Sequence, residues 1–146
     1  FVEDSYLPLI RELGIGFIAY SPLGRGMLTG TITGAHSLAE GDRRHDHPRF
    51  QAENITANVA LVAPLRDIAA TKNVTPSQLA LAWLLAQGDD ILPIPGTKNK
   101  SHMLENIAAS MINLSAGEIA DIGAAINPDL VSGTRYPEKQ LGGLGI

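Results

Sequence analysis

The stretch GIGFIAYSPLGRGMLTG, residues 14–30, decides the fold class of this chain. Its first part, residues 15–20, is an apolar run between turn residues, and this pattern predicts a strand buried on both faces, as in a parallel sheet. Its second part, residues 21–26, predicts a glycine-rich loop that ends the strand. Residues 91–94 predict a second short strand, which Pro95, Gly96 and Thr97 close.

Helical segments surround these two strands. Apolar residues at helical spacing predict helices over residues 4–13, 54–72, 76–87, 101–110 and 116–125. Pro64 is expected to kink or split the second helix. Thr75 with Gln78, and Ser115 with Glu118, form the capping-box pattern at two helix starts. We expect a long, partly mobile loop over residues 29–50 and a tail that becomes ordered on contact over residues 127–146.

The alternation of strands with helical segments indicates βα units and a parallel sheet, so the expected fold class is α/β. Two parallel strands form no stable sheet unaided, because both faces and both edges need partners. The chain begins with Phe1 rather than Met. It is therefore expected to be a piece of a longer protein, with residues 1–146 forming part of one domain.

Composition narrows the kinds of partner. The chain has a formal net charge of −4, a pI near 5.5 and no run of basic residues, which argues against nucleic acid and against an anionic membrane surface. No apolar run approaches the roughly 20 residues that span a bilayer, and no signal peptide is visible. The absence of cysteine removes disulfides, thiolate metal sites and cysteine nucleophiles, and it fits a cytoplasmic protein.

The loops that follow the two strands carry the candidate chemistry. In the first loop, glycines allow backbone amides to approach an oxyanion, and Ser21 and Arg25 can add hydrogen bonds; a plain strand-exit turn explains the same residues. In the second, a helix start flanked by Lys98 and Lys100 suits a phosphate, and a capped helix with surface lysines is the alternative. Both loops follow the C-terminal ends of parallel strands, which form the active face of a (β/α)₈ barrel.

The order of these motifs resembles that of the aldo-keto reductases. The resemblance rests on GIGFIAYSPLGRGMLTG, on PRF and EN between residues 48 and 54, on TPSQLALAWLL, on ILPIPGTK and on EN at residues 105–106. Bacterial reductases with an SPLGRG loop and a GxRY tail, here residues 133–136, are especially similar. The resemblance implies the C-terminal portion of a (β/α)₈ TIM barrel, namely strands 7 and 8 with their helices and a C-terminal tail.

The resemblance also implies a site for NADPH. The cofactor-binding residues that it implies are Tyr20, Ser21, Pro22, Leu23, Gly24, Arg25, Gly26, Ile94, Pro95, Gly96, Thr97, Lys98, His102, Glu105 and Asn106. Tyr20 would lie beneath the nicotinamide, the SPLGRG loop along the pyrophosphate, residues 96–98 at the 2′-phosphorylated ribose, and residues 105–106 at the adenosine. His102 stands where relatives often carry an arginine or a glutamine, so Lys98, with Lys100, is expected to supply the cation for the 2′-phosphate.

In this family the complete protein transfers a hydride from NADPH to an aldehyde or a ketone. The family's catalytic Asp, Tyr, Lys and His lie on strands that this sequence does not contain, so we assign no catalytic residue and no metal. Residues 1–146 alone are expected to reduce no carbonyl compound. The expected partners are a small-molecule carbonyl substrate and the remaining N-terminal part of the barrel or a second copy. Two alternatives stay open: a non-catalytic module that binds a nicotinamide cofactor, and an inactive truncated fragment.

Other side chains have simpler explanations beside the functional ones. His45 and His47 could ligate a metal, but two histidines in a polar loop without a third ligand are more often solvated. The mixed charges of residues 42–44 and Arg49 indicate either a solvated loop or a lid over the cofactor or substrate. The resemblance implies that the tail at Arg135 and Tyr136 shapes the substrate pocket, and a surface clamp is the alternative.

Two sets of apolar residues are expected in the core rather than in a site. Met103, Ile107 and Met111 recur at four-residue spacing, which predicts a buried helix face. Trp83 is expected to pack inside from an outer helix.

Overall fold

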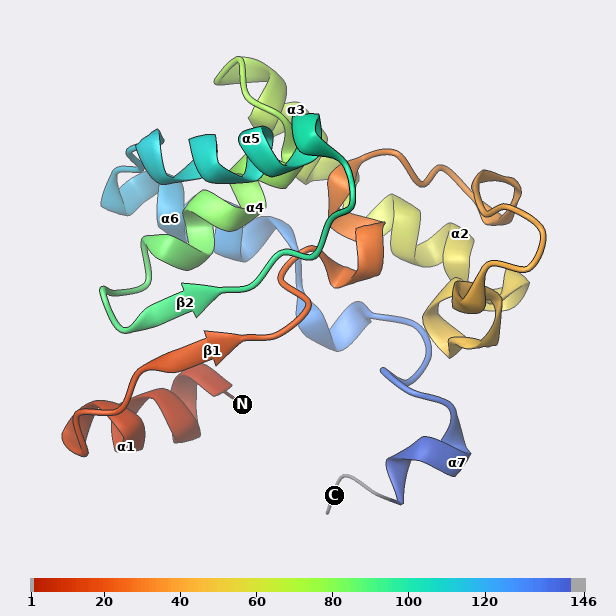
Figure 1. The fold of residues 1–146 in the computed structure, drawn as a ribbon, viewed down its shortest axis with the longest axis horizontal. Coiled ribbons are helices and arrows are strands. Elements are labelled where there is room, and N and C mark those ends of the chain that lie inside the picture. The colour runs from red at the N-terminus through yellow and green to blue at the C-terminus, as the bar shows by residue number, and fades with distance from the viewer. Residues whose placement is uncertain (1, 143–146) are drawn as a thin grey trace.

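The computed structural model describes residues 2–142. Strand β1 (Phe17–Ala19) pairs in parallel with β2 (Ile91–Pro93), and Phe17 lies opposite Ile91. Figure 1 shows both arrows pointing the same way, so the segments that follow the two strands leave the sheet at one end. The predicted parallel pair is therefore confirmed, and it brings the two candidate loops to the same edge.

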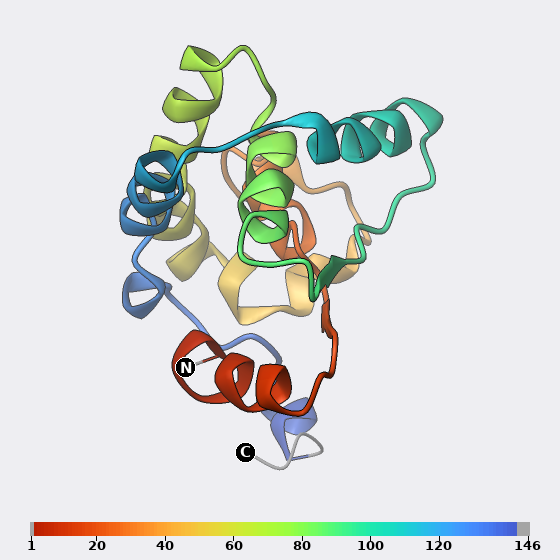
Figure 2. The same ribbon diagram turned by 90° about the vertical axis from the view of Figure 1, so that its left-hand side faces the viewer.

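The helices follow in chain order around this pair. Before β1 come a π-helical turn, Val2–Tyr6, and α1 (Leu7–Glu12); between the strands lie α2 (Ala52–Leu61), α3 (Ala63–Thr71) and α4 (Pro76–Leu85); after β2 come α5 (Lys100–Ala108), α6 (Ala116–Ala125) and α7 (Glu138–Leu141). Short 3₁₀ turns span Gly24–Thr29, Ala35–Ser37, Arg43–Asp46, Pro48–Phe50, Ala109–Met111 and Pro128–Leu130. Figures 1 and 2 both show α1 and α7 at the lower end of the molecule, away from α3 and α5.

Local signals set several helix boundaries as predicted. The segment containing Pro64 splits into α2 and α3 at Val62, because proline donates no amide to the preceding turn. Thr75 Oγ1 accepts a hydrogen bond from the Gln78 amide at 3.1 Å, and Gln78 Oε1 accepts one from the Thr75 amide at 3.0 Å. Ser115 and Glu118 form the same reciprocal pair at the start of α6. Both predicted capping boxes are confirmed.

Buried apolar side chains gather in three clusters. The first joins the loop after β1, the long loop and α2; the second joins α3, α4 and α6; the third joins α1 to the sheet. Trp83 packs against the second cluster, and its indole Nε1 donates to the Ile119 carbonyl at 2.9 Å. The expectation that Trp83 is a packing residue is thereby confirmed.

The sheet is shorter than the sequence predicts, and one of its faces is open. Ile15 lies outside β1 because its amide donates to the Ile10 carbonyl at the end of α1, at 2.8 Å. Ile18 is 61% exposed and Leu92 is 51% exposed. Only the face that carries Ala19 and Ile91 packs against α1 and α4, so the prediction of burial on both faces is wrong for the part of the chain that the structure describes.

The predicted core face of α5 is also exposed. Met103 and Ile107 are on the surface, and Met111 is 80% exposed. Within residues 2–142 this prediction is wrong, because four-residue spacing defines a common face but does not say what covers it.

The long loop and the tail carry more structure than expected. Ile32, Leu38 and Phe50 are buried in the first cluster, although they follow no helical or strand period. The tail contacts α2, where Asn58, only 3% exposed, donates to the Ser132 carbonyl at 2.8 Å and accepts from the Ser132 amide at 2.9 Å. The sequence did not predict the short helix α7. Residues 143–146 of the predicted tail lie outside the described residues, as does Phe1 at the other end of the chain.

Candidate functional site

The loop after β1 is a tight double turn. Ser21, Gly24, Arg25 and Gly26 all have φ between +52° and +97°. The amide of Gly24 donates to the Ser21 carbonyl, and that of Gly26 to the Leu23 carbonyl, both at 2.9 Å. Left-handed conformations at the two non-glycine residues are strained, so the surrounding fold holds this loop in place.

The loop after β2 is simpler and more exposed. Thr97 Oγ1 accepts from the Asn99 amide at 3.1 Å, and the Asn99 side chain caps α5 by accepting from the Ser101 amide at 2.8 Å. The amides of Gly96, Thr97 and Lys98 donate to no acceptor among residues 2–142. These amides, next to a helix N-terminus and Lys98, form a suitable cradle for an anion.

The two loops line one cleft of about 610 Å³. Eleven of the fifteen residues implied by the resemblance line it, namely Ser21, Pro22, Leu23, Arg25, Gly26, Pro95, Gly96, Thr97, His102, Glu105 and Asn106. The cleft therefore joins segments about 70 residues apart in sequence. Tyr20 and Gly24 line a neighbouring cavity instead, and Ile94 and Lys98 line neither of these two spaces.

Six lining residues were not among the predicted ones. They are Thr29, Thr31, Arg44, Thr75, Pro76 and Ser77. Thr75 Oγ1 donates to the Glu105 carboxylate at 2.5 Å while it also caps α4. The capping signal was visible in the sequence, but it did not show that this helix start faces the cleft.

Arg44 connects the long loop to the loop after β1. Its Nη1 donates to the Arg25 carbonyl at 3.1 Å, and its Nη2 pairs with the Asp42 carboxylate at 2.6 Å. The hydrogen bonds from the Arg44 side chain, followed by the one from its amide, lower the pKa of Asp42 to about 2. Of the two explanations for these charges, the structure favours a segment positioned at the cleft, since Arg44 lines it.

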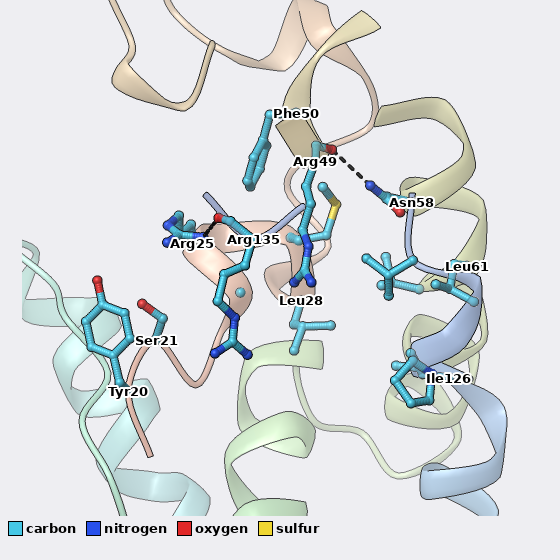
Figure 3. A pocket seen from close by; sticks show the side chains of 15 residues that line it. Tyr20, Ser21, Arg25, Leu28, Arg49, Phe50, Asn58, Leu61, Ile126 and Arg135 are labelled. Carbon is cyan, nitrogen blue, oxygen red and sulfur yellow. Dashed lines mark hydrogen bonds between the residues drawn. The ribbon is translucent and has the colours of Figure 1, made fainter. Parts of the chain in front are cut away.

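The neighbouring cavity has a volume of about 220 Å³ and lies between the loop after β1 and the tail (Figure 3). Tyr20, Ser21 and Arg25 line one part of it, and Arg49 and Arg135 line another. Leu28, Phe50, Leu61 and Ile126 are among the apolar residues that line it as well. Ser21 and Arg25 line both spaces, so the cavity adjoins the cleft.

Tyr20 stands at the end of β1 with 63% of its surface exposed. The pKa of its phenol is lowered, first by hydrogen bonding to the Ser21 hydroxyl and then by Tyr136, with a further contribution from the charge of Arg25. Its exposed ring leaves a flat aromatic face open to a ligand.

His47 is more enclosed than His45. Its Nδ1 is buried and has no hydrogen-bond partner in the described chain. Burial lowers the pKa of His47, and the nearby charge of Arg25 lowers it further. Across residues 2–142, no three His, Asp or Glu side chains gather as a metal site would require.

None of the helices in the described chain is long and apolar enough to cross a membrane.

A cleft built from two loops at the carboxyl ends of adjacent parallel strands is typical of the ligand-binding edge of an α/β protein. The sequence model of the Aldo/keto reductase family matches residues 1–127. The chain belongs to this family.

An individual relative gives the same family. The chain is 48% identical over 135 residues to the aldo-keto reductase yakc of Schizosaccharomyces pombe, whose name specifies NADP(+); the match covers 92% of this chain and 40% of the yeast protein. The chain therefore spans about two fifths of the length of this relative.

Two solved structures share the fold. A thermostable aldo-keto reductase crystallised with the inhibitor epalrestat matches with a TM-score of 0.58 and 26% identity, over 84% of this chain and 34% of that chain. The glycerol dehydrogenase of Gluconobacter oxydans matches with a TM-score of 0.74 and 21% identity, over 87% of this chain and 41% of that chain. The aldo-keto reductase relationship implies a TIM-barrel fold, of which this helix-rich chain matches only a part.

Proposed function

We propose that this chain forms the cofactor-binding portion of an NADPH-dependent aldo-keto reductase that reduces aldehydes or ketones to alcohols. The observation that carries this proposal is the cleft of about 610 Å³ in which the two strand-exit loops meet. The family membership and the NADP(+) in the name of the yeast relative support the choice of cofactor. NADPH, when bound, supplies a hydride to the carbonyl carbon, and the carbonyl oxygen takes up a proton, leaving an alcohol and NADP⁺.

The residues of the cleft fit such a cofactor. Ser21, Arg25 and the glycine-rich turn offer donors for a pyrophosphate, and the unpaired amides of residues 96–98 offer donors for a second anionic group. Lys98, which is exposed beside those amides, is the cation that we assign to the 2′-phosphate. The Glu105 carboxylate is held by Thr75, so it is positioned before any ligand binds.

Replacement of Lys98 tests the cofactor assignment. In the full gene product, Lys98→Glu should weaken NADPH binding by roughly tenfold or more, because it exchanges a charge-assisted contact for repulsion, and should change NADH binding by less than about twofold. Both dissociation constants can be measured from the fluorescence of the reduced nicotinamide.

Lys139→Glu is a matched control, because Lys139 is an exposed lysine on α7, away from the cleft. It makes the same change in net charge and should leave both constants unaltered. Equal losses of NADPH and NADH affinity in Lys98→Glu would show that Lys98 does not bind the 2′-phosphate.

The open face of the sheet fits the expected partner. Ile18 and Leu92 present apolar side chains there with no covering element among residues 2–142. We propose that the remaining part of the barrel, or a second copy, covers this face. Strong hydrogen-exchange protection of β1 and β2 in a monomer consisting of residues 1–146 alone would contradict this.

A further inference from the structure

The cavity of about 220 Å³ gathers three guanidinium groups. Arg25, Arg49 and Arg135 line it, and no Asp or Glu is among its lining residues. None of the three forms an ion pair with a carboxylate of the described chain, whereas Arg11 and Arg44 pair with Asp90 and Asp42. Three positive charges therefore meet in one concave site with no counter-charge from residues 2–142.

The contacts of these arginines leave most of their donors unused. Arg25 Nη1 donates to the Arg135 carbonyl at 3.1 Å and its guanidinium lies 4.6 Å from the centre of the Tyr136 ring. Arg49 Nε donates to the Gly133 carbonyl at 3.4 Å. The Arg135 guanidinium donates to no acceptor in the described chain. Since each guanidinium carries five N–H donors, the cluster can bind an anion without losing these tethers.

The fold brings these positive charges close enough to repel one another, and a bound anion would offset this repulsion. Figure 3 shows the side chains of Arg49 and Arg135 extending in the same direction, into the space between Ser21 and Leu28. Burial lowers the pKa of Arg49, and the charges of Arg135 and Arg25 lower it further. Like charges that repel in a partly desolvated site make that site attractive to a carboxylate or phosphate.

The other residues that line the cavity indicate which kind of molecule would bear the anionic group. Leu28, Leu61 and Ile126 form an apolar wall, and Tyr20 lines the cavity next to Ser21, which also lines the cleft. Arg49 and Arg135 line this cavity and not the cleft. A small molecule with an apolar body and one acidic group would place its acid on Arg49 and Arg135, which line only the cavity, while its other end reaches toward Tyr20.

We propose that this cavity is the substrate's anion-binding subsite, so that the preferred substrates are carbonyl compounds bearing a carboxylate or a phosphate. The proposal rests on the proposed function, because it assigns a substrate class to that reductase. The same anionic chemistry could come from the cofactor's phosphates, and the experiment below separates the two sources.

Arg135→Gln is the sharpest test, because this side chain has no structural partner in the described chain. In the full gene product, turnover of 4-formylbenzoate is compared with turnover of its methyl ester, which has a similar shape but no charge. Arg135→Gln should raise KM for 4-formylbenzoate by about tenfold or more, and Arg135→Lys should recover part of that loss, while KM for the ester changes little. The dissociation constant of NADPH should stay the same.

Arg43→Gln is the matched control, since it removes a positive charge from the exposed part of the long loop and lines neither space. It should leave the preference for the charged aldehyde intact. An equal change for acid and ester in Arg135→Gln, or a loss confined to NADPH binding, would overturn the proposal.

Calorimetric titration with benzoate distinguishes failure of this proposal from failure of the proposed function. If the wild-type protein turns over neither aldehyde, the reductase assignment fails. Benzoate binding that is lost in Arg135→Gln and kept in Arg43→Gln would then still support the anion site. A wild-type protein that does not bind benzoate would overturn the anion site, whatever the activity.

Discussion

The two strand-exit loops line the same cleft but are held in different ways. The loop after β1 contains four residues at positive φ and is tied to the long loop through Arg44 and to the tail through Arg25. The loop after β2 has only a local turn from Thr97 to Asn99, and a side chain built at Gly96 would meet nothing within 4 Å. The first loop owes its shape both to its own turn hydrogen bonds and to distant parts of the chain, whereas the second owes its shape to neighbouring residues alone.

This difference predicts that substitutions near the first loop affect mainly the stability of the fold, whereas substitutions in the second loop affect mainly ligand binding. Changes around the first loop should lower the free energy of unfolding, because several elements depend on one another there. Changes in the second loop should leave the fold stable and affect what the unpaired amides and Lys98 bind. Paired substitutions of the same residue type in the two regions can test this division.

Two asparagines provide the largest expected contrast. Asn58 is buried and bonds to the carbonyls of Arg49 and Ser132 and to the Ser132 amide, so it supports the tail beside the first loop. Asn58→Ala should lower the free energy of unfolding by about 2–4 kcal/mol, because it leaves buried backbone groups without partners. Asn99→Ala removes only the cap of α5 and should cost about 1 kcal/mol. Denaturant titration of the full gene product measures both, and equal losses would contradict the division.

The same residues show what the sequence could and could not predict. The capping boxes at Thr75 and Ser115 and the break at Pro64 are local patterns, so they predicted the helix boundaries. The bonds from Asn58 to Ser132 join residues 74 positions apart, and no local pattern indicates them.

The residues of the candidate site also fall into two groups, those that sequence motifs predict and those that only the fold brings to the cleft. Motifs adjacent to the strands predicted residues of the cleft, whereas Arg44 and Thr75 reach it only through tertiary packing. The exposed Met111 shows the opposite failure, in which a local period suggested burial that no packed neighbour in the described chain provides.

Two glycine substitutions, one in each loop, are expected to give an intermediate difference in stability. Gly26 has φ +97°, and a Cβ there would lie 2.9 Å from Arg44 Nη1. Gly26→Ala should therefore cost about 1–2 kcal/mol through backbone strain and displacement of Arg44. Gly96→Ala has open space and should leave the free energy of unfolding unchanged within about 0.5 kcal/mol. A stability loss in Gly96→Ala as large as that in Gly26→Ala would show that the second loop is also fixed by the fold.

The smallest expected effect concerns the ion pair between Arg44 and Asp42, which orients the side chain that donates to the first loop. Asp42→Asn keeps an oxygen that can accept a hydrogen bond from the Arg44 amide but removes the negative charge. It should therefore lower the free energy of unfolding by less than about 1 kcal/mol near pH 6. The pKa of Asp42 is depressed from 3.8 to about 2 in the folded protein, so its carboxylate stabilises the fold above pH 4 and loses that effect as the pH falls toward 2.

The difference in thermal midpoint between the wild type and Asp42→Asn should accordingly narrow as the pH falls from 6 to 3. Glu118, whose pKa is also about 2 because Lys72 donates to it, is present in both proteins, so its titration cancels from the difference. A difference that stays constant over this range would mean that the charge of Asp42 does not stabilise the folded chain. The tie between Arg44 and the first loop would then depend on the Arg25 carbonyl alone.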